Sequence, residues 1–250
     1  MSTDPIAVVP VRSLLVIRPP QPPWWAMTTE GLAGAGLHGQ GSAEAAGFFT
    51  ARLVLMSLLA AGVRPLALSH AVQAAGEAET DRVLTGIRTC LEAAGLQDLP
   101  LQGHRCRGEG TGPMLSVTGM GLVEPAAFTP GRARPGDEVY MVGHQIDRPE
   151  EQLKPNDATI PGFAHLQRLR TAAHDVLPVG NVPMPQAVAA LAEAAGLVFR
   201  PVTGVPDWLW TRPAGPATCL LAAVPRTAVP VVTALPLPVT HIGRLEAPPA

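Results

Sequence analysis

A continuous apolar run from Leu53 to Ala61, interrupted only by Ser57, places the strongest constraint on the fold. A helix with so little polar surface is stable only when most of its sides are buried. Alanine, leucine and methionine favour a helix, and Gly62 followed by Pro65 is a typical helix end. Leu66 to Val72 then has the pattern of a short buried strand. The sequence therefore predicts a core built around one apolar helix.

Arg52 directly precedes this run and puts a cation near the expected helix start, where the helix dipole disfavours it. Two interpretations are open. In one, the guanidinium reaches an acidic or phosphate partner. In the other, the alkyl stem packs on the helix while the charged end meets water.

Composition excludes several classes of protein. The 250 residues with 47% hydrophobic content are sufficient for one large domain or two small ones. A net charge of −2 gives no basic surface for nucleic acid or for an acidic membrane. Lys154 is the one lysine of the chain, and no GxxxxGK[ST] motif is present, so a P-loop is excluded.

The cysteines and the hydropathy pattern favour a cytoplasmic protein. Cys90, Cys106 and Cys219 form no CxxC pair, so neither a disulfide framework nor a zinc ribbon is expected. The first residues lack the basic region of a signal peptide. No uninterrupted apolar stretch reaches the roughly 18 residues of a membrane span, and we expect none.

The pattern of elements predicts an α+β chain of two domains. Residues 1–13 are interpreted as a loose arm. Glu77 to Gly95 is the clearest amphipathic helix, and Met114 to Val123 alternates as a long strand. Another strand is expected at Glu138 to Val142. The polar, proline-broken segment Asp147 to Asp157 predicts the boundary between domains at residues 14–146 and 158–246.

Gly34, Gly36 and Gly39 form a GxGxxG pattern between an expected strand and the apolar helix. Glycines let backbone N–H groups approach an anion at a helix N-terminus, which favours a phosphate cradle. A dinucleotide site also needs an acidic residue about 20 positions later, where this chain has the apolar helix, so we reject it. A flexible loop without a ligand remains the alternative.

A second glycine-rich segment carries basic residues. His104, Arg105, Cys106 and Arg107 follow an expected strand that ends at Gly103. One histidine and one cysteine without a second pair do not make a metal site. The two arginines fit an anion better. An exposed basic turn is the alternative.

The second half of the chain has one candidate site edge. Asp175 starts an expected strand, and Gly180 and Asn181 lie in the turn that follows it. The carboxylate either lines a binding site or is a buried cap for the backbone.

The order of these features resembles the AIR synthase superfamily, which includes aminoimidazole ribonucleotide synthase, thiamine-monophosphate kinase and selenophosphate synthetase. The resemblance rests on Phe48 to Arg52 (FFTAR), His174 to Asn181 (HDVLPVGN) and Pro213 to Cys219 (PAGPATC). These motifs are most similar to the α-ribazole kinase branch of the superfamily. The resemblance covers residues 14–246.

The resemblance implies an N-terminal domain that pairs across a two-fold axis into a β-barrel in a homodimer, followed by a C-terminal α+β domain. It implies phosphoryl transfer from ATP with Mg²⁺ to a ribazole- or nucleoside-like small-molecule alcohol, as in cobalamin biosynthesis. The residues implied are Gly34, Gly36, Gly39, Arg52, Arg105 and Arg107 for phosphate, His104, Asp175, Gly180 and Asn181 for substrate, and Glu30 and Asp175 for metal.

The chain departs from the superfamily at its acidic metal positions. The aspartate at the end of the second strand corresponds to Thr28 and Thr29, followed by Glu30. A Ser-Thr-Glu-Glu-Asn run of the related kinases is replaced here by residues 104–108. Mg²⁺ needs carboxylates to hold it against phosphates. The alternative is therefore a catalytically degenerate homologue that binds an anionic metabolite or nucleotide, or acts as a structural partner.

Overall fold

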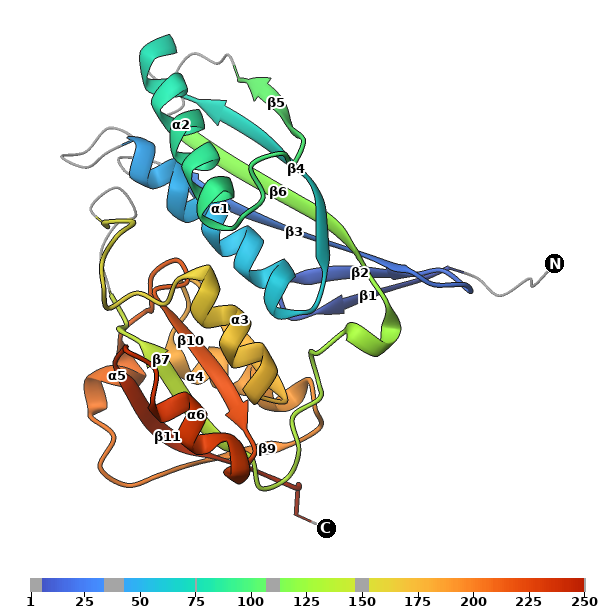
Figure 1. Cartoon of the computed structure of the whole chain (residues 1–250), viewed down its shortest axis with the longest axis vertical. Coiled ribbons are helices and arrows are strands. Elements are labelled where there is room, and N and C mark those ends of the chain that lie inside the picture. The colour runs from blue at the N-terminus through green and yellow to red at the C-terminus, as the bar shows by residue number, and fades with distance from the viewer. Residues whose placement is uncertain (1–5, 34–42, 75, 107–112, 147–152, 250) are drawn as a thin grey trace. The chain divides into compact units, whose positions relative to one another are not determined.

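The computed structural model describes residues 6–33, 43–74, 76–106, 113–146 and 153–249 (Figure 1). The chain forms two compact units. Unit 1 comprises Met1–Ala127 and Arg148–Asp157, and unit 2 comprises Phe128–Asp147 and Ala158–Ala250. Each unit has its own sheet and helices, which makes the fold a mixed α+β one, as expected.

Unit 1 is built on a six-stranded sheet with the order β1-β2-β3-β6-β4-β5 (Figure 1). Neighbouring strands are antiparallel except for β4 and β5, which run parallel. The sheet is open, so a closed barrel is not formed by one chain. The strands are β1 (Ala7–Val11), β2 (Leu14–Arg18), β3 (Trp24–Ala33), β4 (Arg64–Gln73), β5 (Leu101–Arg105) and β6 (Met114–Val123).

The first strand corrects the expectation of a loose N-terminal arm. β1 pairs with β2 over its whole length, from Ala7 opposite Arg18 to Val11 opposite Leu14. Its residues are mostly exposed and include Pro10, so the local sequence lacks the burial pattern of a strand. The strand β1 is stabilised by its pairing with β2 and not by its local sequence.

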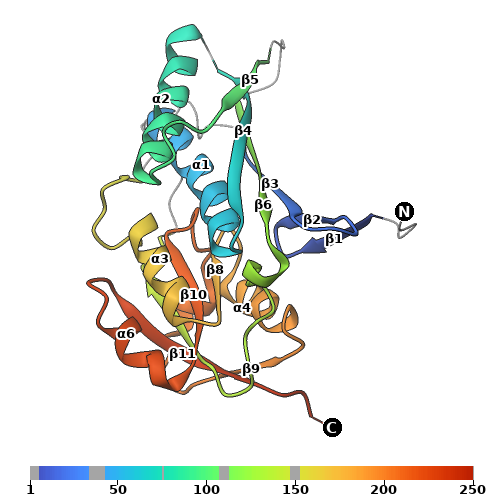
Figure 2. The same cartoon turned by 45° about the vertical axis from the view of Figure 1, so that its right-hand side comes forward.

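Helix α1 (Ala43–Ala60) lies between the sheet and helix α2 (Glu77–Ala93), as Figure 2 shows. Almost every residue of α1 is buried. It has the length and composition of a membrane span, but 89% of it is buried inside the structure, which is typical of a core helix. The helix begins at Ala43, well before the expected start, so Arg52 lies in its middle.

Two glycines allow α1 and α2 to approach each other closely. A Cβ atom on Gly47 of α1 would lie 2.1 Å from the Val83 carbonyl oxygen. A Cβ atom on Gly86 of α2 would lie 1.8 Å from the Glu44 carbonyl oxygen. Both distances are far below contact, so any larger residue would push the two helices apart.

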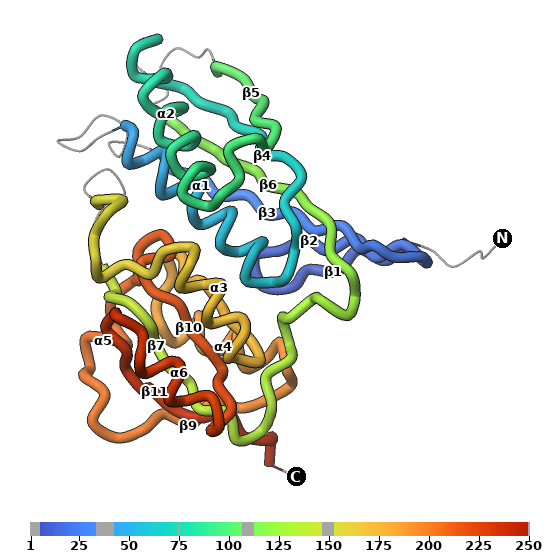
Figure 3. The backbone as a smooth tube through the Cα atoms, viewed as in Figure 1, coloured from blue at the N-terminus to red at the C-terminus, as the bar shows by residue number. Residues whose placement is uncertain are grey.

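Unit 2 contains an antiparallel five-stranded sheet with the order β8-β10-β7-β11-β9. Figure 3 traces the chain through β7, β9, β10 and β11 of this sheet. The sequence placed β7 on the N-terminal side of the domain boundary, but β7 pairs with β10 and β11 in this second sheet. The strands are β7 (Glu138–Gly143), β8 (Asp175–Pro178), β9 (Val198–Pro201), β10 (Cys219–Val224) and β11 (Val239–Glu246).

Strands β7 and β10 are buried at every residue, because helices cover both faces of the sheet. Continuous apolar runs are typical of strands in this position. Helix α4 packs with α5 and with β8, β9 and β10, and helix α3 packs with α6 and with β8 and β10. The helices are α3 (Phe163–Ala172), α4 (Met184–Glu193), α5 (Asp207–Thr211) and α6 (Val229–Thr233).

Candidate functional site

The expected phosphate cradle lies largely outside the described residues. Gly34, Gly36, Gly39 and Arg107 all fall in the segments that the structure does not describe. The flanking elements are those that the pattern requires, because β3 ends at Ala33 and α1 begins at Ala43. The segment thus runs from a strand into a helix N-terminus, the arrangement in which backbone N–H groups bind anions.

Arg52 is buried, with 3% of its surface exposed. The interpretation that its charged end meets water is therefore wrong. Loss of solvent lowers the pKa of Arg52 to about 10, and the nearby Cys90 of α2 opposes that shift. Because α1 begins at Ala43, nine residues before Arg52, the arginine lies in the middle of a buried helix. Its contact with phosphate remains a prediction.

Arg105 is the last residue of β5, not part of a loop. The strand continues this far because Ala71 and Val72 of β4 pair with His104 and Arg105. The guanidinium donates to Glu77 at 3.0 Å and to Asp81 at 2.9 Å, both on α2.

These ion pairs are on the surface, since the three side chains are 47%, 90% and 65% exposed in that order. Exposed pairs of this kind contribute at most about 1 kcal/mol each. A phosphate at Arg105 would compete with two carboxylates, but each of these exposed ion pairs is weak.

His104 is exposed on the same strand and contributes to a positive local field. The pKa of the neighbouring His70 is lowered, first by burial and then by the charges of Arg88 and His104. Basic side chains therefore lie near one another at this end of β4 and β5, together with the Glu77 and Asp81 carboxylates that pair with Arg105. Binding of an anion by this segment stays a prediction.

Glu30 lies in β3 opposite Val117 of β6 and is partly buried. It shares a strand face with Thr28, and the Thr28 hydroxyl donates to the Ser13 carbonyl oxygen at 2.9 Å. The Thr29 hydroxyl lies 2.8 Å from that of Thr118. The two threonines at the superfamily's aspartate position therefore take part in hydrogen bonds that hold the sheet.

The described residues do not provide a Mg²⁺ cage. They contain no group of three or more His, Cys, Asp or Glu side chains placed to hold a metal ion. Glu30 and Asp175, the two expected ligands, belong to different units. The described residues therefore do not fit a Mg²⁺ site of the kind that the resemblance implies.

Asp175 is 1% exposed and opens β8. Its Oδ2 accepts a hydrogen bond from the Gly131 N–H at 2.9 Å. The carboxylate thus holds the backbone of the segment that precedes β7. This is the geometry of a buried cap, the second of the two interpretations that the sequence allowed.

Gly180 and Asn181 lie beyond the opposite end of β8. The four residues of this strand span about 13 Å, so the structure separates the turn from the Asp175 carboxylate. The strand and its turn are placed as the sequence predicts, and the grouping of Asp175, Gly180 and Asn181 in one site stays a prediction.

The turn after β8 instead meets the segment before β10. The Ala217 N–H donates to the Val179 carbonyl oxygen at 2.8 Å, and the Val179 N–H donates to the Cys219 carbonyl oxygen at 3.1 Å. The Thr218 hydroxyl accepts the Ile146 N–H at 3.2 Å. The segments after β7 and β8 and the segment before β10 therefore converge, and two of the three resemblance motifs, at residues 174–181 and 213–219, take part.

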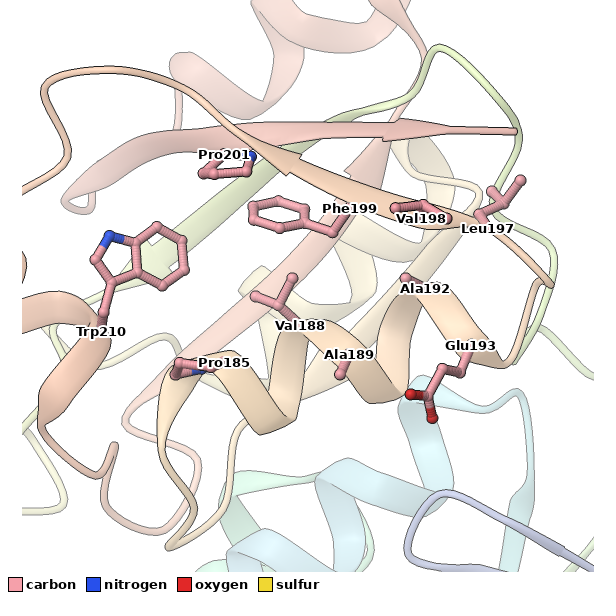
Figure 4. Close-up of a pocket in the computed structure, with 10 residues that line it drawn as sticks. All are labelled: Pro185, Val188, Ala189, Ala192, Glu193, Leu197, Val198, Phe199, Pro201 and Trp210. Atoms are coloured by element: carbon pink, nitrogen blue, oxygen red, sulfur yellow. The ribbon is translucent and has the colours of Figure 1, made fainter. Parts of the chain in front are cut away.

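Sequence reasoning missed an apolar cavity of about 700 Å³ between α4, α5 and β9 (Figure 4). The Phe199 and Trp210 rings lie 6.0 Å apart at 56° on its wall. No local pattern joins these elements, so the sequence carried no signal for the cavity. The lining residues are Pro185, Val188, Ala189, Ala192, Glu193, Leu197, Val198, Phe199, Pro201 and Trp210.

No protein-family model and no curated protein sequence matches the chain. Solved structures do match it. Thiamine-monophosphate kinase from Stenotrophomonas maltophilia K279a superimposes with a TM-score of 0.68 and 19% identity over 98% of this chain and 90% of that one. The chain shares the fold of thiamine-monophosphate kinase.

Other similar structures agree with this assignment. Thiamine monophosphate kinase from Aquifex aeolicus gives a TM-score of 0.65 at 17% identity, over 90% of this chain and 86% of that one. T. maritima PurL complexed with ATP gives 0.65 at 13% identity, over 98% of this chain and 42% of that one. At these identities the likeness concerns the fold.

Proposed function

We propose that the protein is an ATP-dependent small-molecule kinase-like member of the AIR synthase superfamily. The observation that carries the proposal is the likeness in fold to thiamine-monophosphate kinase over nearly the whole of both chains. The proposed reaction transfers a phosphoryl group to a ribazole- or nucleoside-like alcohol in the cytoplasm, as part of cobalamin biosynthesis.

Catalysis of phosphoryl transfer is largely positioning and neutralisation of phosphate charge. In the proposal, the glycine-rich segment 34–42 binds phosphate at the N-terminus of α1. Arg52, Arg105 and Arg107 supply positive charge, and His104 contacts the substrate. Gly180 and Asn181 contact the alcohol substrate. Of the two expected Mg²⁺ ligands, Glu30 remains in the proposal, because the Asp175 carboxylate caps the Gly131 backbone instead.

A second candidate is a degenerate homologue that binds an anionic metabolite or a nucleotide without turnover. Two observations favour it. Thr28 and Thr29 stand where a metal-binding aspartate is expected and are engaged in hydrogen bonds within the sheet. A run that holds two acidic residues in the related kinases holds none at residues 104–108 and carries two arginines, which meet bare anions well but do not bind Mg²⁺.

We also propose a homodimer formed through the sheet of unit 1. Leu15, Met27 and Met120 are direct cross-strand neighbours on β2, β3 and β6. They are 40%, 36% and 39% exposed, and Trp25 beside them is 40% exposed. Apolar rows of this kind are typical of protein interfaces.

Thermal unfolding with ATP, ADP or phosphate, each with and without Mg²⁺, separates the two candidates. A ligand that binds the native state raises the melting temperature. Stabilisation by ATP only with Mg²⁺, together with ATP consumption on adding α-ribazole, is expected for the kinase. Stabilisation by metal-free nucleotide without turnover favours the degenerate homologue. No response to any nucleotide contradicts both.

Arg105→Ala tests the basic segment in the same assay. Because its ion pairs are on the surface, the free energy of unfolding should fall by no more than about 1 kcal/mol. The nucleotide response should weaken about tenfold in apparent affinity. Arg64→Ala, an exposed arginine at the opposite end of β4, is the matched control for a general loss of positive charge. An unchanged affinity in Arg105→Ala removes this residue from the site.

A further inference from the structure

Unit 2 contains a second cavity, of about 510 Å³, whose wall is dominated by positive charge. It lies where the segment before β7 meets the end of α3 and the residue before β8. No carboxylate lines it. The lining residues are Thr129, Arg132, Arg134, Arg170, Ala173 and His174.

Two buried acidic residues cap the backbone beside this wall. Asp137 is 3% exposed and accepts the Arg134 N–H at 2.8 Å, and its carboxylate lies 2.9 Å from His174 Nδ1. Asp175 accepts the Gly131 N–H. Both carboxylates therefore hold the segment that carries the arginines.

Backbone hydrogen bonds fix the segments that form this wall. Arg134 to Asp137 is a turn closed by the Asp137 N–H donating to the Arg134 carbonyl oxygen at 3.1 Å. Pro135 and Gly136, with φ of +91° at the glycine, suit its central positions as a type II turn. On the other side, the His174 N–H donates to the Ala223 carbonyl oxygen at 2.9 Å. The cavity wall is thus preorganised.

Arg170 is the key side chain of this wall. Its Nε is buried and makes no hydrogen bond within the described part of the chain. Loss of solvent also lowers the Arg170 pKa, because burial disfavours its charge. A guanidinium in this situation is stabilised by an oxyanion, which accepts two parallel N–H bonds.

We propose that this cavity binds a small phosphate-bearing metabolite, with Arg170 and Arg134 on the phosphate. Three guanidinium groups around one cavity match a multiply charged tetrahedral oxyanion better than a single carboxylate. His174, whose Nδ1 faces Asp137, has Nε2 left to face the ligand. The volume leaves space for the group that carries the phosphate. All contributing residues belong to unit 2, so the site is independent of the nucleotide site proposed above.

Isothermal titration of the full chain with inorganic phosphate and with pyrophosphate tests this proposal. We expect binding to weaken at least tenfold in Arg170→Gln and in Arg134→Gln. Arg168→Gln is the matched control, because it removes an exposed arginine from the same helix. It should leave affinity within twofold of wild type. Melting temperatures of the variants verify that each is folded.

The proposal is overturned if the wild type binds neither anion, or if Arg168→Gln loses as much affinity as the other two variants. It is also overturned if Arg170→Gln and Arg134→Gln both bind with wild-type affinity. Tighter binding of citrate than of pyrophosphate overturns the choice of phosphate. The thermal response to ATP should persist in Arg170→Gln. A wild-type chain without an ATP response but with Arg170-dependent phosphate binding refutes the proposed function and supports this cavity.

Discussion

Three basic side chains converge on Glu138, the first residue of β7. Its carboxylate oxygens lie 3.2 Å from Arg226 Nε, 3.0 Å from Arg244 Nη2 and 2.9 Å from His241 Nε2. The Glu138 side chain is only 10% exposed. Burial alone would raise its pKa, but the hydrogen bonds from Arg244, Arg226 and His241 outweigh burial and lower it. The carboxylate is therefore a stabilising group only while it is ionised.

Glu138→Gln should lower the free energy of unfolding by about 1–3 kcal/mol at pH 7, because charge-assisted hydrogen bonds are lost. The folded pKa lies below the unfolded value of about 4.3, so this contribution is present above that value. It disappears as the pH falls through the folded pKa. Urea unfolding of both proteins between pH 7 and pH 3 measures the difference, which should shrink below about pH 4. A difference that is constant with pH contradicts the prediction.

At the level of elements, the contact between α1 and α2 depends on two glycines. Gly47→Ala and Gly86→Ala should each destabilise unit 1 by about 1–3 kcal/mol or more, because the added Cβ meets backbone atoms that have no room to move. Urea unfolding measures the loss. Gly31→Ala is the matched control, since its Cβ would lie 3.7 Å from its nearest neighbour. A loss as large in Gly31→Ala would show that helix contact is not the cause.

Elements with a strong internal period were predictable from sequence. Met114 to Val123 was expected as a strand and forms β6 with those bounds, and the amphipathic helix from Glu77 ends two residues before its expected end. The missed parts depend on distant partners. β1 exists through its pairing with β2, and β5 extends to Arg105 through its pairing with β4. Local propensity carries no signal for such pairings.

The site was less predictable than the elements, for the same reason. Arg105 meets Glu77 and Asp81, residues that precede it by more than twenty positions. The strand that begins at Asp175 was expected from the sequence, but the hydrogen bond of its carboxylate to Gly131, a residue 44 positions earlier, was not. The cavity at Arg170 joins three segments of unit 2, so no single motif could have indicated it.

For the whole molecule, the open face of the unit 1 sheet predicts a dimer. Light scattering coupled to size exclusion should give twice the chain mass of 26.0 kDa. Met27→Lys should weaken dimerisation at least about 100-fold, because a two-fold interface receives the buried charge twice. Met27 is suited to this test because it is flanked by Leu15 and Met120 at the centre of the row.

Val231→Lys, on α6 of unit 2, is the matched control because Val231 is a similarly exposed apolar residue outside this sheet. It should remain dimeric at the concentrations where Met27→Lys becomes monomeric. Equal dissociation of the two variants would assign the effect to net charge, since each adds one lysine. A wild-type chain that is monomeric at every concentration would remove the interface altogether, and the apolar row would then need another partner.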